Sequence, residues 1–269
     1  MEPVRPEFAP DPALSRSEME RLQRELADAA TFTDDLGFDP ESVHLDDADQ
    51  QTLDTGTDDA PDAPLVAGVD QAFVDDVAVS AVVVSRGDEV VERVHAAVET
   101  AIPYIPGLLS FREGGAILAA FAELDCQPDL LVVDGSGRIH FREAGLATHI
   151  GVMLDTPAVG VAKNLLCGEP RESLDRKLPV GTCIGIEADD GVETTTPGTL
   201  IGYALQTRQY ESSKRHVNPL YVSPGHLVSA ATAADLVEAT AAGYKLPEPT
   251  RLADSYADEV KAEVRDERR

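Results

Sequence analysis

Residues 65–99 read LVAGVDQAFVDDVAVSAVVVSRGDEVVERVHAAVE and contain the most informative pattern of the chain. The apolar run 65–70 and the Val-rich run 77–85 are typical of buried strands, because β-branched side chains pack well on a pleated sheet. Residues 89–99 could form a strand or a helix, but the Gly87 turn favours a third strand, antiparallel to the second. The stretch therefore predicts a sheet that begins with three antiparallel strands.

Beyond this stretch, helical and strand patterns alternate along the chain. Apolar periodicity and β-branched runs predict helices over 111–124, 145–155 and 227–240, and strands at 129–135, 157–164, 180–187 and 199–206. Residues 103–110 contain two prolines and a glycine, which predicts a shaped loop. The order of elements predicts an α/β fold, a mixed sheet with helices on both faces.

The flanking segments differ from this core. Residues 14–31 have apolar positions at helical spacing and predict a helix. Between Asp34 and Asp62 there are eleven acidic residues and no Lys or Arg, which indicates a flexible acidic insert. We therefore divide the chain into an N-terminal helix segment 1–32, an acidic insert 33–64, a folded domain 65–249 and a charged tail 250–269 that is frayed or helical.

The charge of the chain is strongly acidic. In its 269 residues, 49 Asp and Glu face 22 Lys and Arg, which gives a net charge of −27. Alone, this charge argues against a nucleic-acid partner. A large acidic excess with little Lys, however, is typical of proteins adapted to concentrated salt, where the Debye length falls to about 3 Å. The charge therefore indicates adaptation to concentrated salt, and it is only weak evidence about the binding partner.

Two further classes of protein are disfavoured by composition. No apolar run approaches the roughly 20 residues that a membrane span needs, so we expect no membrane partner. Cys126, Cys167 and Cys183 are an odd number of widely spaced cysteines, which argues against a disulfide framework or a zinc ribbon. Both observations fit a cytoplasmic protein.

Two aspartates follow buried strands. Asp70 ends the run 65–70, and Asp134 ends LLVVD before Gly135. A turn or a cap would explain either residue alone. If the two strands are neighbours, both carboxylates lie at one sheet edge, and Mg²⁺ is bound by one or two carboxylates together with substrate phosphates.

Glu113 and His226 could complete this group. Glu113 lies in the first turn of the helix predicted over 111–124, as a favourable charge near the helix dipole or as a third acid beside the metal. His226 follows Pro224 and Gly225 at a predicted helix start, as an ordinary packed or surface residue or as a neutral imidazole that moves a proton. Together the four residues predict metal-assisted hydrolysis of a phosphodiester.

Several long sequence motifs resemble those of the endonuclease V family. They are VAGVD (66–70), PYIPGLLSFREG (103–114), PDLLVVDGSGRIH (128–140), GLATHIGV (145–152), TPAVGVAKN (156–164) and PLYVSPGHLVS (219–229). The resemblance covers about 65–245 and the helix at 14–31. It implies a ribonuclease H-like fold with a mixed five-stranded sheet, and Mg²⁺ (with Mn²⁺ as a substitute) bound by Asp70 and Asp134, while Glu113 and His226 complete the catalytic group. With the charge, it implies a salt-adapted organism of haloarchaeal type.

The resemblance also implies contacts with damaged DNA. Tyr104 would be a wedge between Pro103 and the Ile105–Pro106 pair, although packing under its own loop is the commoner fate of such a tyrosine. Lys163 would contact a phosphate. The lesion pocket would be formed largely by backbone groups, at Gly107, Leu109, Gly135, Gly145 and Leu146, with His140 nearby.

The activity implied is hydrolysis of the second phosphodiester bond 3′ to deoxyinosine, which leaves 3′-hydroxyl and 5′-phosphate ends. The alternatives are an inosine-specific endoribonuclease and a lesion-binding protein that does not cut. Phe141, Gly115 and Asn164 depart from the family pattern, which usually has Pro, Pro and Ser there. We expect a monomer without a protein partner.

Overall fold

The structure is a computed structural model that describes residues 1–43, 63–212 and 215–268. Its strands are β1 (Leu65–Val74), β2 (Val77–Arg86), β3 (Glu89–Glu99), β4 (Leu130–Asp134), β5 (Ala158–Ala162), β6 (Glu169–Pro170), β7 (Cys183–Glu187), β8 (Leu200–Leu205) and β9 (Leu220–His226). Its helices are α1 (Arg16–Ala29), α2 (Leu109–Ala122), α3 (Leu146–Leu154), α4 (Ala230–Ala239) and α5 (Glu248–Glu267), with 3-10 turns at Pro6–Phe8 and Pro40–Ser42. Among these helices, none has both the length and the apolar character of a membrane span.

All strands join one sheet in the order β3-β2-β1-β4-β5-β9-β8-β7-β6. The first five form the expected ribonuclease H-like core: β1, β2 and β3 are antiparallel, and β4 and β5 run parallel to β1. The remaining four strands continue from β5, because β9 pairs with its free edge. The mixed α/β fold is confirmed, and the sheet is wider than the expected five strands.

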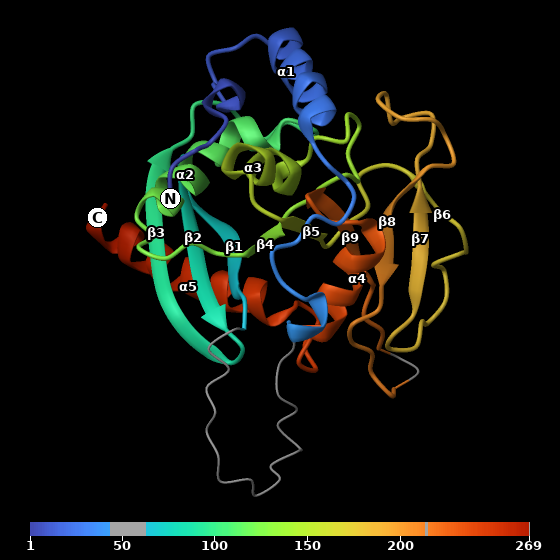
Figure 1. Cartoon of the computed structure of the whole chain (residues 1–269). Helices are drawn as coiled ribbons and strands as arrows, with labels where there is room; N and C mark the ends of the chain where they lie inside the picture. Colours follow the sequence, from blue (N-terminus) through green and yellow to red (C-terminus); the bar gives the residue numbers. More distant parts are fainter. Residues whose placement is uncertain (44–62, 213–214, 269) are drawn as a thin grey trace, which may run out of the picture.

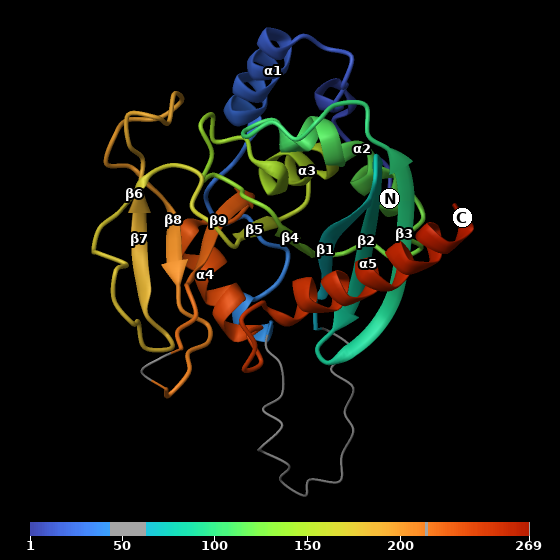
Figure 2. The ribbon, with the colours of Figure 1, turned by 180° about the vertical axis from the view of Figure 1, so that it is seen from behind.

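Helices cover both faces of the twisted sheet (Figures 1 and 2). On one face α2 and α3 pack on alternate side chains of the central strands, such as Ala67 and Val69. On the other face α4 packs against β8 and β9, in an apolar cluster that also holds side chains of β4 and β5, and α5 packs against β1 and β2. This two-sided cover explains why β1, β2 and β4 read as nearly continuous apolar runs.

The C-terminal residues belong to the folded body. The helix α5 begins at Glu248, so the predicted boundary between 249 and 250 falls inside it, and Ala253, Ala257 and Val260 are buried against the sheet. Gly68 in β1 makes this close packing possible, because a Cβ there would lie 1.8 Å from the carbonyl oxygen of Pro249. The segment is therefore a packed helix and not a separate charged tail.

Part of the predicted acidic insert also packs on the core. Residues 44–62 lie outside the described residues, but in 33–43 the Val43 side chain is buried and Phe38 packs against the same apolar cluster. The Asp34 carboxylate accepts hydrogen bonds from Ser229 N (2.6 Å) and Thr232 Oγ1 (2.8 Å) at the start of α4. The expectation of a flexible insert is therefore wrong for 33–43, because Asp34 is hydrogen-bonded to the start of α4, Val43 is buried and Phe38 is partly buried.

Candidate active site

Asp70 and Asp134 lie side by side on neighbouring strands, Asp134 at the end of β4 and Asp70 within β1, which continues to Val74 and so does not end at Asp70 as expected. β1 and β4 are parallel neighbours in which Val69 pairs with Val133, so the two aspartates follow side by side. This is the edge at the carboxyl ends of the parallel strands, where open α/β sheets bind ligands. The expectation that the strands are neighbours is confirmed.

The two carboxylates form an anionic centre with little compensation. Asp70 is only 8% exposed, and burial together with the charge of Asp134 raises its pKa to about 8, while the Gln71 backbone N–H and Lys163 act in the opposite direction. The Lys163 ammonium lies 2.7 Å from an Asp134 carboxylate oxygen. Such a pair of oxygen ligands suits a bound cation, which would reverse the local charge balance.

Glu113 approaches this centre from the α2 side. The helix begins at Leu109, two residues earlier than expected, so Glu113 lies in its second turn and not its first. Burial raises the pKa of Glu113 to about 7; Arg112 lowers it, and the charge of Asp134 adds to the rise. The effect of Asp134 places Glu113 in the same electrostatic environment as the aspartates.

Asp254 is a fourth acidic residue of this centre that the sequence reading missed. It lies in α5, on the sheet face that Gly68 and Asp70 share, and its charge acts on both Asp70 and Lys163. The signal was available in the spacing of Ala253, Ala257 and Val260, which predicts a packed helix with Asp254 at the margin of its buried face.

His226 does not join this group. It ends β9 and pairs with Ala158 at the start of β5, whereas Asp134 pairs with Val161 near the end of β5. Three residues of strand separate these positions by roughly 10 Å along the sheet. The His226 ring accepts a hydrogen bond from Thr31 N (3.1 Å) and lies 3.4 Å from Asp155. Its expected catalytic place is therefore corrected: Pro224 and Gly225 belong to a buried strand, not to a helix start, and His226 anchors the N-terminal segment.

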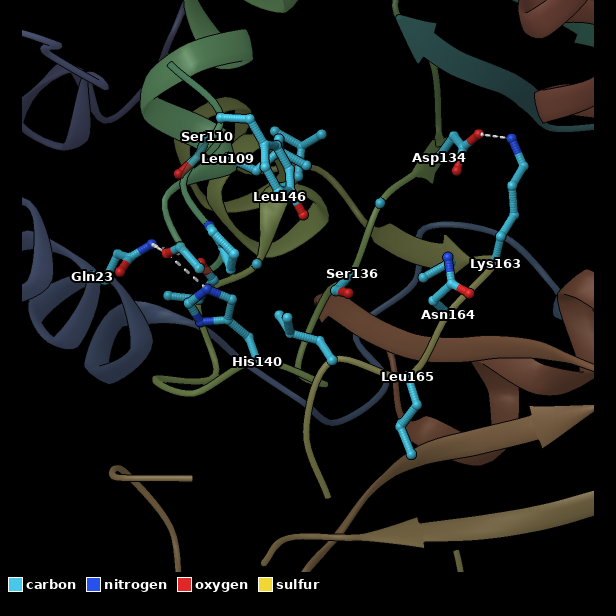
Figure 3. Close-up of a pocket in the computed structure, with 18 residues that line it drawn as sticks. Gln23, Leu109, Ser110, Asp134, Ser136, His140, Leu146, Lys163, Asn164 and Leu165 are labelled. Carbon is cyan, nitrogen blue, oxygen red and sulfur yellow. Dashed lines mark hydrogen bonds and ion pairs between the residues drawn. The ribbon is translucent and has the colours of Figure 1, made fainter. Parts of the chain in front are cut away.

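A cavity of about 480 Å³ opens beside Asp134 (Figure 3). All the residues expected at a lesion pocket line it: Gly107, Leu109, Gly135, His140, Gly145 and Leu146. Lys163, Tyr104 and Pro106 also line it, and so do Gln23, Ser110, Ser136 and Asn164, which the sequence reading did not assign. The volume fits a ligand of nucleobase size.

One carbonyl group ties the wall of the cavity to α1. Figure 3 shows the Gln23 amide and the His140 ring converging on the Gly107 carbonyl oxygen, at 2.8 Å from Gln23 Nε2 and 3.1 Å from His140 Nε2. Gln23 Oε1 also accepts a hydrogen bond from Arg142 Nε (2.8 Å). Gly107 has φ of +79°, a conformation that favours glycine. This network fixes the turn at the mouth of the cavity.

The protonation state of His140 follows from its contacts. Burial and the nearby Arg142 charge lower its pKa to about 3, so the ring is neutral. Its Nδ1 accepts from the Arg142 backbone N–H (3.2 Å), which leaves the proton on Nε2 for the Gly107 carbonyl. His140 therefore positions the loop and is not a free acid or base.

Tyr104 stands at the open side of the cavity. Its ring is 60% exposed, so it is not packed under its own loop. Pro103 and Pro106 are also exposed, whereas Ile105 packs on the cluster around Leu108 and Phe111. The loop thus presents a ring to solvent from a stiff, anchored backbone, which suits stacking on a base.

The donor set fits a divalent cation that the substrate helps to bind. Within the described residues, no three His, Cys, Asp or Glu side chains form a preformed cage. Asp70 and Asp134 instead supply hard oxygen ligands. The single positive charge of Lys163 does not balance the negative charge of the two carboxylates. Mg²⁺ commonly takes such a site, with the substrate phosphates among its ligands.

A family model, a protein sequence and a solved structure that match this chain all come from one protein family. The family model for Endonuclease V matches residues 48–255. An endonuclease V of the haloarchaeon Haloarcula marismortui is 69% identical over 266 residues, which cover 97% of this chain and 98% of the relative. The crystal structure of the Streptomyces avermitilis endonuclease V superposes with a TM-score of 0.72 at 31% identity, over 93% of this chain and 95% of the other.

A more distant structure shares the fold and contains a nucleic acid. Ciona intestinalis endonuclease V, in complex with a 24-mer DNA containing an inosine followed by a ribo-adenosine, superposes with a TM-score of 0.65 at 22% identity, over 92% of this chain and 98% of that one. The Haloarcula relative confirms the salt-adapted origin that the composition indicated. From the family match and the near full-length identity, this chain belongs to the endonuclease V family of nucleases.

Proposed function

We propose that this protein is a Mg²⁺-dependent DNA repair endonuclease that recognises deoxyinosine and other deaminated bases. It hydrolyses the second phosphodiester bond 3′ to the lesion and leaves 3′-hydroxyl and 5′-phosphate ends. The observation that carries this proposal is the junction at β4, where Asp134 belongs to the anionic centre and the next residue, Gly135, lines the cavity. The inosine-containing DNA bound to the Ciona relative supports the choice of substrate.

In this reaction the chain binds the lesion and orients the strand. The cavity accepts a flipped base, and Tyr104 stacks in the gap that the base leaves. Backbone N–H groups of the pocket select the carbonyl at position six of inosine. Lys163, beside Asp134, lies where it can contact the phosphate on the cleaved strand.

Four acidic side chains serve the hydrolysis. Asp70 and Asp134 would hold Mg²⁺, which when bound would supply activation of water and neutralisation of the leaving oxygen. Asp254 adds negative charge at the same edge, and Glu113, with a pKa raised to about 7, can hold or release a proton near neutral pH. A protein that only marks lesions would gain nothing from burying these charges together.

The test is a nicking assay on an inosine-containing duplex with Asp134→Ala, Asp254→Ala and a matched control, Asp258→Asn. Asp258 lies one turn beyond Asp254 on α5, and its side chain is 71% exposed. We expect both alanine variants to lose at least about 100-fold in cleavage rate, to keep inosine-DNA binding and to leave the control at the parent rate. Matched inosine RNA and EDTA samples complete the assay. Cleavage of RNA alone would refute the DNA assignment, and unchanged nicking by Asp134→Ala would remove Asp134 from the mechanism.

A further inference from the structure

Free positive charge is scarce on this acidic protein and is concentrated in one place. Most described Lys and Arg side chains have a carboxylate within 4 Å, for example Lys163 with Asp134 and Arg138 with Glu143. Within residues 1–43, 63–212 and 215–268, those without one are Arg86, Arg93, Arg112, Lys177, Arg208, Arg215, Lys245 and Arg265. Half of this set lies on or against the connection between β8 and β9.

Three of these four cations, Lys177, Arg208 and Arg215, contact Tyr210. The Arg215 guanidinium lies 4.1 Å and that of Arg208 lies 5.5 Å from the centre of the Tyr210 ring. The Lys177 ammonium donates to the carbonyl oxygens of Tyr210 and Ser212. We call Lys177, Arg208, Tyr210, Arg215 and Lys245 the β8–β9 cation cluster. Its guanidinium groups lie over the Tyr210 ring, and no carboxylate of the described residues forms an ion pair with them.

The topology places this cluster at the edge that holds the active site. β9 is antiparallel to both β5 and β8, so β5 and β8 end at the same edge. At that end Ala162 pairs with Tyr221, and Leu205 pairs with Leu220. Lys163 and residue 206 therefore leave the sheet two strand spacings apart, about 10 Å.

Lys245 links the two sites. Thr207 Oγ1 donates a hydrogen bond to the Lys245 carbonyl oxygen (2.6 Å). Burial lowers the pKa of Lys245, and the positive charge of Lys163 lowers it further, so the charges of the two lysines repel each other. Lys245 is thus linked to Lys163 at the catalytic edge by its charge and to Thr207 in the β8–β9 connection by its backbone.

We propose that the β8–β9 cation cluster binds the phosphate backbone of the substrate duplex to one side of the scissile bond. This inference rests on the proposed function. Along one DNA strand phosphates advance about 3.4 Å per nucleotide, so the separation of about 10 Å between the points where the chain leaves β5 and β8 corresponds to roughly three phosphates. At molar salt only contacts at hydrogen-bond range escape screening, and planar guanidinium groups held by a ring form such contacts.

The test compares two double variants that change the net charge equally. Arg208→Ala/Arg215→Ala removes the cluster's two arginines. Arg86→Ala/Arg265→Ala removes two other arginines of the same set; Arg86 pairs with Leu65 at the opposite edge of the sheet. Binding to inosine-containing and undamaged duplexes is measured by fluorescence anisotropy without divalent cations, across a KCl series.

We expect the cluster variant to bind both duplexes about 10-fold more weakly at 0.5 M KCl, with an unchanged preference for inosine. The slope of log K against log [KCl] should fall by about 1.8, from about 0.9 per phosphate contact. Arg208→Lys/Arg215→Lys should recover most of the slope, which guards against misfolding. Trimming the duplex on one side of the lesion should abolish the difference between the variant and the parent.

Other results would overturn the inference. Equal weakening by the two double variants would mean that only total charge matters, and an unchanged salt slope would exclude phosphate contacts. If the parent protein nicks inosine DNA but Arg208→Ala/Arg215→Ala binds DNA as tightly as the parent, only the proposed role of the cluster is refuted. A parent protein that does not nick inosine DNA at all would refute the proposed function instead.

Discussion

The buried amide of Gln23 joins two parts of the chain that are far apart in sequence. It is 1% exposed and connects α1 to the Gly107 turn and to Arg142. Gln23→Leu would leave the Arg142 Nε without its partner in a buried site, which costs about 1–3 kcal/mol. We expect a lower urea midpoint with an unchanged m-value. We also expect weaker binding of inosine duplex but unchanged binding of undamaged duplex.

Arg21→Gln is the control for this prediction. Arg21 lies on the same helix, its side chain is 71% exposed, and its ion pair is the surface contact with Glu25 at 3.8 Å. The control should match the parent within about 0.5 kcal/mol. If Gln23→Leu also kept full stability and lesion preference, Gln23 would have no positioning role.

At the scale of elements, the contact between β1 and α5 decides whether the acidic centre assembles. A methyl group at residue 68 would collide with the Pro249 carbonyl at 1.8 Å, so Gly68→Ala must push α5 off the sheet and move Asp254 from Asp70. We expect a loss of roughly 1–3 kcal/mol in unfolding free energy from overpacking, and loss of nicking. Urea unfolding and the nicking assay measure the two effects.

Gly115→Ala provides the opposite case. Gly115 lies in α2 and is exposed, and a Cβ added there would meet no atom within 4 Å. Alanine there should stabilise the protein by about 0.5–1 kcal/mol, because glycine is a poor helix former. If Gly68→Ala behaved like Gly115→Ala, the close approach of α5 would not constrain β1.

Local patterns in the sequence predicted most elements, but not the contacts made across long stretches of chain. The β-branched runs and the helical face of 111–124 predicted β1, β2, β4, β5 and α2, because burial on a sheet or helix face leaves a periodic signal. Pro224 and Gly225 suggested a helix start at His226, yet neighbouring strands bury them in β9. That tertiary pairing overrides local propensity, and it moved His226 away from the predicted site.

The charge density of 250–269 concealed α5 in a similar way. The polar face dominates the composition of 250–269, so this segment was predicted to be a charged tail. Its short apolar stripe and Asp254 were therefore overlooked. The neighbouring positions of Asp70 and Asp134 were easier to predict, because an aspartate in an otherwise apolar strand is itself a local signal. The cavity residues from α1, above all Gln23, left no such signal.

At the scale of the whole molecule, two buried histidines should make stability depend on pH. Burial lowers the pKa of His149 to about 4 and that of His140 to about 3, whereas an unfolded histidine titrates near 6.5. Below pH 6.5 the unfolded chain therefore binds protons that the folded chain does not. Stability falls with decreasing pH, at a limiting slope of about 1.4 kcal/mol per pH unit for each histidine, until His149 itself titrates near pH 4.

The measurement is urea unfolding from pH 7.5 to 4.5 in parent and His149→Gln proteins. Taking the difference between the two cancels the titration of the carboxylates. His149→Gln should have the shallower pH dependence, and the exposed His216→Gln should follow the parent. A parallel pH profile for parent and His149→Gln would show that His149 is not held neutral.

The net charge of −27 predicts a second whole-molecule property. The carboxylates repel one another over a Debye length of about 10 Å at 0.1 M salt but only about 3 Å at 1 M. We expect the urea midpoint and the nicking activity to rise between 0.1 M and 3 M KCl. Full activity at low salt together with collapse at 2–3 M KCl would contradict this account.

The long reach of the acidic centre along the chain has a consequence during protein synthesis. Asp70, Glu113 and Asp134 leave the ribosome well before α5, which carries Asp254 and completes the cover of β1. Under the proposed reaction, a polypeptide that is still being synthesised, or that is truncated by a premature stop codon, contains Asp70, Glu113 and Asp134. It lacks Asp254 and therefore a complete acidic centre. Under that proposal, the complete acidic centre can form only after α5 has been synthesised.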